Sequence, residues 1–204
     1  MSKTKQFVKK SKKPSQFADL YIRRLFDVFN NIDKKKIDRL FNILDRHRKK
    51  NKNIFVAGNG GSSSTASHMQ NDINFDVMKK SKSIKPFKFL CLTDNSPSIT
   101  AISNDLSYDD VFSKQIEIFG NKGDLIIVIS ASGNSINLLN AVKKANKLGI
   151  YSYGFLGFDG GKLKKECNDY ILVPTDKNEY GLVEDTHIIL NHLISHWFQV
   201  KIDN

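Results

Sequence analysis

Five short apolar runs follow one another through the central part of the chain, separated mostly by stretches with helical spacing. The runs cover residues 54–57, 87–92, 125–130, 151–156 and 170–173. Apolar strands that alternate with helices are typical of a parallel sheet covered on both faces. The pattern therefore predicts an α/β fold built on a doubly wound, five-stranded parallel sheet.

Two helices are predicted before the first strand. Apolar residues recur at helical spacing over residues 16–32, and Asp33 has the character of an N-cap for a second helix. The apolar positions are Phe17, Leu20, Leu25 and Val28 in the first helix, and Ile37, Leu40, Phe41 and Leu44 in the second. We expect a helical hairpin that covers one face of the sheet or pairs with the hairpin of another subunit.

Length and composition indicate one globular domain, with 204 residues of which 40% are hydrophobic. No apolar stretch approaches the roughly 20 residues that span a bilayer, and the Lys-rich start lacks the apolar region of a signal peptide. Cys91 and Cys167 form no C-x-x-C motif, so neither a disulfide framework nor a thiolate zinc site is indicated. We expect a cytoplasmic protein without membrane contact.

The formal net charge of +11 is concentrated at the start of the chain. Without six lysines of this segment the charge falls to +5; they are Lys3, Lys5, Lys9, Lys10, Lys12 and Lys13. Such a polar segment has little to bury, so residues 1–14 are predicted to be a disordered basic tail and residues 15–204 a single domain. A tail that contacts nucleic acid or an acidic surface is the alternative, and we do not expect a nucleic-acid partner.

Two Gly/Ser-rich segments each follow an apolar run and precede a helical pattern. They are A-G-N-G-G-S at residues 57–62 and S-A-S-G-N-S at residues 130–135. Free backbone N–H groups, hydroxyls and a helix N-terminus then meet at one point, which suits a phosphate. Ser and Asn also occur at turns and N-caps without a ligand. Neither segment is a P-loop or a dinucleotide fingerprint, so a sugar phosphate is favoured over a nucleotide.

A third set of polar residues has the spacing of a catalytic or metal site. His68 and Asp72 share one helix face at i, i+4, while Glu184 and His192 are roughly 80° apart around a predicted helix over residues 183–200. Two imidazoles and two carboxylates suit zinc or a similar ion. A carboxylate and a histidine also suffice for the proton transfers of aldose–ketose isomerisation. A hydrogen-bonded structural histidine is the alternative for each imidazole.

Together these motifs resemble the sugar isomerase (SIS) domain family, and in particular its phosphoheptose isomerase branch. The resemblance rests on G-N-G-G-S at 58–62, His68, N-D at 104–105, S-x-S-G-N-S at 130–135 and E-D-T-H-x-x-x-x-H at 184–192. It implies flavodoxin-like layering and conversion of sedoheptulose 7-phosphate to D-glycero-D-manno-heptose 7-phosphate, for surface polysaccharide such as lipopolysaccharide or capsule. It also implies a homotetramer.

The resemblance assigns roles to individual residues. The acid/base pair would be Asp72 and His192, and one zinc ion per subunit would be held by His68, Asp72, Glu184 and His192. Substrate-binding residues would be Ser62, Ser130, Ser132 and Ser135 for the phosphate, with Asn59, Gly60, Asp105 and Glu184 addressing the rest of the sugar. The chain departs from the family pattern where Asp72 replaces the usual Glu, Glu184 the usual Gln, Asp76 a basic residue and Ala131 the usual Thr.

Two other functions are compatible with the same motifs. One is a non-enzymatic SIS protein that binds a replication initiator, and the other is a sugar-phosphate sensor. Retention of His68, Asp72, Glu184 and His192 together favours the isomerase, since a pure adaptor has no need of this set.

Overall fold

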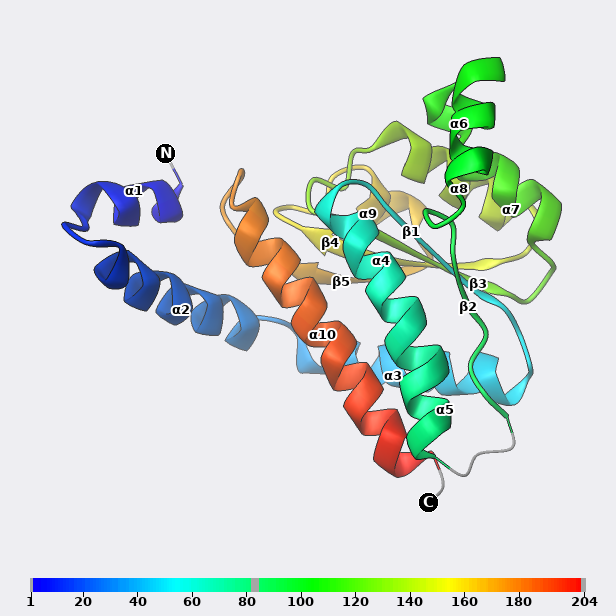
Figure 1. Ribbon diagram of the computed structural model, residues 1–204, viewed down its shortest axis with the longest axis horizontal. Helices are drawn as coiled ribbons and strands as arrows, with labels where there is room; N and C mark the ends of the chain where they lie inside the picture. Colours follow the sequence, from blue (N-terminus) through cyan, green and yellow to red (C-terminus); the bar gives the residue numbers. More distant parts are fainter. Residues whose placement is uncertain (1, 82–84, 203–204) are drawn as a thin grey trace.

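The computed structural model describes residues 2–81 and 85–202. Its centre is a five-stranded, all-parallel sheet with the order β2-β1-β3-β4-β5 (Figure 1). The strands are β1 (Ile54–Gly58), β2 (Phe89–Cys91), β3 (Leu125–Ser130), β4 (Tyr151–Gly157) and β5 (Asp169–Val173). The predicted α/β class is confirmed, and strand order reverses between β1 and β3.

Helices cover both faces of the sheet because successive strand residues point to opposite sides. Val56 and Ile127 join one apolar cluster, while their neighbours Phe55 and Ile126 join the other. The first cluster also takes residues from α3 (Lys34–Lys49), α4 (Gly61–Asn71) and α10 (Tyr180–Lys201). The second takes residues from α7 (Ser113–Phe119), α8 (Ile136–Lys147) and α9 (Leu163–Glu166).

Shorter helical segments complete the fold. A π-helical turn (Asp72–Asp76) continues α4 into α5 (Val77–Lys80), and α6 (Ser96–Asp105) is followed by a 3₁₀ turn (Tyr108–Asp110). Helices α4 and α10 run side by side along one face (Figure 1). Over the described ranges, no helix combines the length and apolar character needed to traverse a bilayer.

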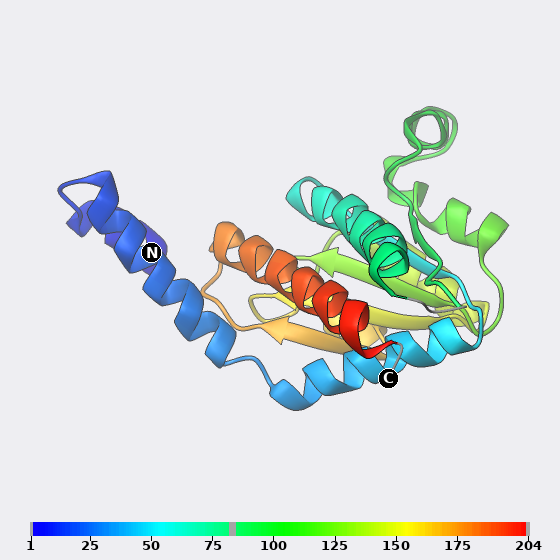
Figure 2. The ribbon, with the colours of Figure 1, turned by 60° about the horizontal axis from the view of Figure 1, so that its bottom comes forward.

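The two predicted N-terminal helices are present, but they do not fold back on each other. After α2 (Pro14–Asn30) the chain continues into α3 in the same general direction, so that α2 projects from the body as an arm (Figure 2). Val28 and Ile32 at the junction are buried in the core, and Asp33 caps α3 as predicted, accepting a hydrogen bond from the backbone N–H of Lys35 (2.9 Å). The connection of residues 31–33 is long enough for a helical hairpin, so the length of the turn does not explain the direction of α3; the burial of Val28 and Ile32 fixes the junction against the core.

The segment predicted to be a disordered basic tail contains a helix, α1 (Lys3–Lys10). Thr4 donates two hydrogen bonds to the carboxylate of Glu179, from its backbone N–H (2.9 Å) and its hydroxyl (2.7 Å). Glu179 precedes α10, so α1 is docked beside the start of that helix. Composition did not reveal this partner because it lies 175 residues away. The domain boundary at residue 15 stays a prediction.

Candidate active site

Both Gly/Ser loops lie at the carboxyl edge of the sheet, after the adjacent strands β1 and β3. In the first loop Gly60 has a φ of +56°, and Ser62 is buried at the start of α4. Asn59 exchanges two amide hydrogen bonds with Asn137 of α8, at 2.9 and 3.0 Å. This pair ties the loops together, at the point of the sheet where α/β proteins bind ligands.

The second loop is shaped by bonds within itself. The hydroxyl of Ser130 accepts from the backbone N–H of Gly133 (3.0 Å), and that of Ser132 accepts from the N–H two residues on (3.3 Å). Gly133 has a φ of +65°, and the carbonyl of Gly160 occupies the space where its side chain would stand. Ser135 is the N-cap of α8 and makes no capping bond with its side chain. Its hydroxyl and the helix N-terminus suit an anion.

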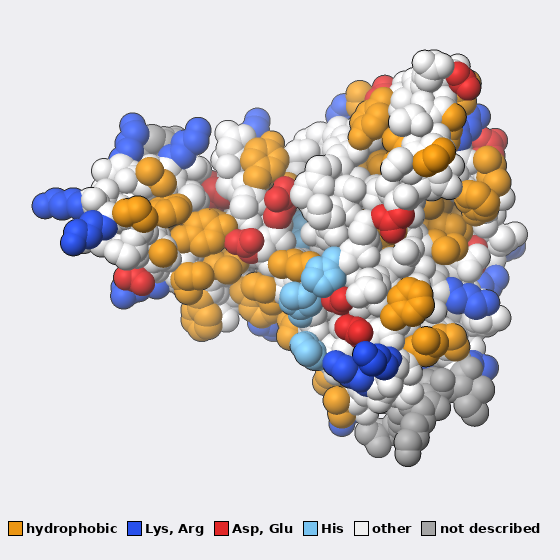
Figure 3. Space-filling view, viewed as in Figure 1, with side chains coloured by type: hydrophobic (Ala, Val, Ile, Leu, Met, Phe, Trp, Pro, Cys, Tyr) orange, Lys and Arg blue, Asp and Glu red, His pale blue; other side chains and the backbone are white. Residues whose placement is uncertain are grey.

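His68, Asp72 and His192 come together on α4 and α10. Nε2 of His68 lies 3.1 Å from Oδ2 of Asp72, and Nε2 of His192 lies 3.9 Å from the same oxygen. Histidine and acidic side chains lie next to each other on this face of the molecule (Figure 3). The Asp72 side chain is 10% exposed, whereas the two imidazoles are nearly half exposed. A buried carboxylate thus faces two accessible nitrogen bases.

The donor set of this group fits a zinc-type ion. One ligand atom from each of the three residues lies within 4.8 Å of the others. Three protein ligands with an open position are typical of catalytic zinc sites, and imidazole and carboxylate are suitable donors.

Glu184 does not lie in this group, so the structure brings together three of the four predicted ligands. Its carboxylate lies against Gly61, at the start of α4. The eight residues between Glu184 and His192 correspond to about 12 Å along a helix axis. The spacing does put both residues on one side of α10, but two turns apart.

Asp105 is also not brought to the loops by any described contact. It is exposed at the end of α6, where it accepts a hydrogen bond from its neighbour Asn104 (2.8 Å). The following turn does reach the first loop, because the hydroxyl of Tyr108 donates to Oδ1 of Asn59 (3.0 Å). Tyr108 was missed from the sequence, since nothing in its local pattern indicates that contact.

Two further residues missed from the sequence contact Asp72 from the buried side of α10. Asn191 is fully buried and donates to Oδ2 of Asp72 (2.8 Å), and the hydroxyl of Ser195 donates to the Asp72 carbonyl (3.4 Å). Their signal in the sequence was that both are polar residues at helical spacing among the apolar residues of the predicted helix. His187 lies deeper on the same helix, beside Phe155, and burial lowers the pKa of His187 to about 4.

The fold and the site define an α/β protein with two anion-type loops at a strand-order reversal, next to a histidine–carboxylate group. The SIS domain model matches residues 17–157, and the chain belongs to the SIS domain family. The resemblance inferred from the motifs is confirmed.

Relatives from several bacteria share most of the chain. A phosphoheptose isomerase of Clostridium acetobutylicum is 36% identical over 160 residues, which are 78% of this chain and 79% of that protein. Another, of Helicobacter pylori strain P12, is 32% identical over 85% of each chain. The solved structure of a phosphoheptose isomerase from Neisseria gonorrhoeae matches with a TM-score of 0.78 and 28% identity, covering 90% of this chain and 95% of that one.

Proposed function

We propose that this protein interconverts sedoheptulose 7-phosphate and D-glycero-D-manno-heptose 7-phosphate. The observation that carries the proposal is the meeting of His68, Asp72 and His192 on helices that begin beside the two Gly/Ser loops. The phosphoheptose isomerase relatives supply the substrate class.

Substrate binding divides between the two ends of this site. Ser62, Ser130, Ser132 and Ser135, with the N-termini of α4 and α8, hold the phosphate. The sugar chain extends along α4 and α10, past Gly61 and Glu184, toward Asp72. The phosphate is remote from the reacting carbons. Its binding fixes the position of the substrate, so that C1 and C2 lie at the carboxylate of Asp72.

Isomerisation requires a carbon proton and an oxygen proton to move. Asp72 removes the proton from C1 of the ketose and returns it to C2 of the enediol. His192 transfers the hydroxyl proton between O1 and O2. The second histidine, His68, contacts the same carboxylate oxygen of Asp72 and holds it toward the substrate.

His68, Asp72 and His192 also hold a zinc ion in this proposal. When bound, such an ion would polarise the two substrate oxygens and stabilise negative charge on the enediol. Without the ion, the contact with His68 orients the carboxylate of Asp72.

The first test measures turnover. Sedoheptulose 7-phosphate is added to the protein with and without zinc, and the anomeric protons are observed by NMR. Asp72→Asn and His192→Ala are expected to abolish formation of the aldose phosphate while circular dichroism stays unchanged. Asp76→Asn is the matched control, because Asp76 lies one turn further and outside the group. Near-normal rates in both site variants would refute the assignment and leave a sensor or an adaptor.

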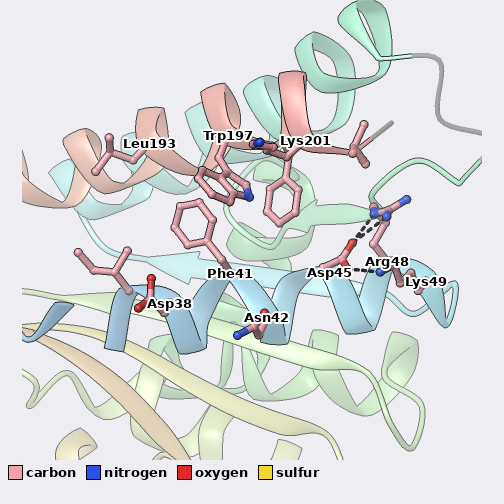
Figure 4. A pocket seen from close by; sticks show the side chains of 12 residues that line it. Asp38, Phe41, Asn42, Asp45, Arg48, Lys49, Leu193, Trp197 and Lys201 are labelled. Carbon is pink, nitrogen blue, oxygen red and sulfur yellow. Dashed lines mark hydrogen bonds and ion pairs between the residues drawn. The ribbon is translucent and has the colours of Figure 1, made fainter. Parts of the chain in front are cut away.

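We also propose a homotetramer, supported by apolar surface on the N-terminal and C-terminal helices. On the arm, Ile22 and Phe26 of α2 are 61% and 67% exposed. A groove of about 580 Å³ lies between α3 and α10, where Phe41 and Trp197 face each other (Figure 4). Light scattering after gel filtration tests this, and a monomeric mass would contradict it.

A further inference from the structure

We propose that Asn191 is a positioning residue for Asp72, holding its carboxylate so that one side of Oδ2 stays open toward the two histidines. This inference rests on the proposed function only for the role of Asp72 in turnover. The hydrogen bond itself is a feature of the fold.

Three nitrogen groups converge on one oxygen. Asn191 Nδ2 is the nearest to Oδ2 of Asp72, at 2.8 Å, compared with 3.1 Å for His68 and 3.9 Å for His192. Asn191 is also the one of the three that is fully buried. It therefore approaches Oδ2 from the core, while the imidazoles approach from the accessible side. One lone-pair direction is taken by a fixed amide, and the accessible side of Oδ2 is left to the imidazoles and to a proton or a metal ion that they share with it.

The amide has an incomplete set of partners. Oδ1 of Asn191 is buried and has no hydrogen-bond partner within the described ranges. Its helix neighbours Leu190 and Ile194 are both fully buried. A leucine at position 191 would avoid the cost of the orphaned carbonyl. The hydrogen bond that the Asn191 Nδ2 group donates to Asp72 explains why a polar residue stands at this position.

The backbone beneath Asp72 is also held by α10. A π-helical turn begins at Asp72, whose carbonyl accepts from the backbone N–H of Val77 and from the hydroxyl of Ser195 (3.4 Å). Gln199 in turn donates to the Ser195 hydroxyl (2.9 Å). Single π turns frequently mark functional positions in helices. Asn191 thus fixes the side chain, and Ser195 the main chain, of the same residue.

The position of Asn191 is also linked to that of His192, because both residues lie on α10. Asn191 and His192 are consecutive on α10, so they project about 100° apart, one into the core and one to the open side. A rigid helix therefore sets the distance between the carboxylate and its histidine.

The test compares Asn191→Leu, which keeps the number and branching of the side-chain heavy atoms and removes the donor, with Thr186→Val on the same helix. Thr186 is a matched control because it is fully buried and, among the described residues, its hydroxyl bonds only to the Leu182 carbonyl of its own helix (2.6 Å). Long-range ¹H–¹⁵N spectra of the metal-free protein report the ring nitrogens of His68 and His192. We expect both rings to shift in Asn191→Leu and to stay unchanged in Thr186→Val.

Turnover gives a second readout. Asn191→Leu is expected to lower kcat by roughly tenfold or more with KM within about twofold, because the phosphate loops are untouched. Thr186→Val keeps kcat within about twofold. Should Asn191→Leu fail to fold, Asn191→Ala, which adds no bulk, carries the same expectation.

Unchanged ring signals and kcat in a folded Asn191 variant would overturn the proposal, as would equal changes in Thr186→Val. Absence of turnover in the unsubstituted protein would instead count against the proposed isomerase. The ring signals would still decide the role of Asn191, so the two failures are distinguishable.

Discussion

The carboxylate of Glu184 lies against Gly61, in the space that a side chain at position 61 would fill. Glycine at the first position of α4 thus lets α10 bring a carboxylate up to the mouth of the site. Glu184 lies two turns from His192 on the same helix, and its carboxylate at Gly61 is outside the His68–Asp72–His192 group.

Gly61→Ala is expected to displace Glu184 and lower kcat/KM by roughly tenfold, since small misplacements at a site carry penalties of this size. Ser64→Ala, an exposed change on the same helix, is the control. If the effect passes through Glu184, the double variant Gly61→Ala, Glu184→Ala will be no slower than Glu184→Ala alone. Simple additivity of the two losses in steady-state kinetics would show that Gly61 acts in another way.

Gly133→Ala is expected to destabilise the protein and weaken substrate binding. The positive φ of Gly133 and the adjacent Gly160 carbonyl leave no room for a methyl group, so we expect a loss of about 1–3 kcal/mol in the free energy of unfolding and a raised KM. Gly149→Ala is a matched control, with a φ of +72° in a loop that faces only the Lys122 side chain. It shares the stability loss but leaves KM unchanged. A normal KM in Gly133→Ala would argue against the second loop as the phosphate site.

The sequence predicted the sheet and the loops well because their signals are local. Each strand is a short apolar run with its loop directly behind it, and the i, i+4 spacing of His68 and Asp72 holds on a real helix. The helical periodicity of residues 16–44 could not predict the direction of α3 after α2. That direction depends on where Val28 and Ile32 are buried in the core.

Contacts between segments far apart in the sequence explain the remaining differences between the predicted site and the structure. Asn191 donates a hydrogen bond to Asp72, which lies 119 residues earlier in the sequence. The carboxylate of Glu184 lies against Gly61 because α4 and α10 run side by side. Helical spacing gives the angle of a side chain around one helix, but not its height against a second one. The fold and the loops could therefore be predicted, while the exact membership of the site required the packed structure.

Zinc binding is expected to depend on three side chains rather than four. His68→Ala should weaken zinc binding by at least about tenfold, whereas Glu184→Ala should leave it within about threefold, because only His68 lies in the group with Asp72 and His192. Competition with a chromogenic chelator measures both, and prior chelator treatment should abolish turnover until zinc returns. Equal losses of zinc affinity in the two variants would show that Glu184 is also a zinc ligand.

Glu179 is expected to hold the N-terminal helices in place. Its side chain is fully buried and pairs with Arg24 of α2 (3.2 Å), besides accepting from Thr4 of α1. Burial raises the pKa of Glu179, but these bonds outweigh it and the pKa lies below its usual value. Glu179→Ala should lower the free energy of unfolding by about 3 kcal/mol, since Arg24 loses its buried partner. Hydrogen exchange in α1 should rise, while Glu117→Ala, at an exposed ion pair, should change neither. Persisting protection of α1 would show that other contacts dock it.

His187 is expected to make the protein sensitive to acid. Burial beside Phe155 lowers its pKa to about 4 in the folded state, while an unfolded chain titrates near its usual value of about 6.5. Between these values the unfolded state binds the proton and the folded state does not, so stability is lost as pH falls from about 6.5 toward 4. The loss from this residue between pH 7 and pH 5 is about 2 kcal/mol. His187→Leu removes the titrating group, and urea unfolding at both pH values should show that part of the pH dependence disappearing. His196→Leu, at an exposed position on the same helix, should keep it. If both variants lose stability with acid as steeply as the unsubstituted protein, the acid sensitivity arises from other groups.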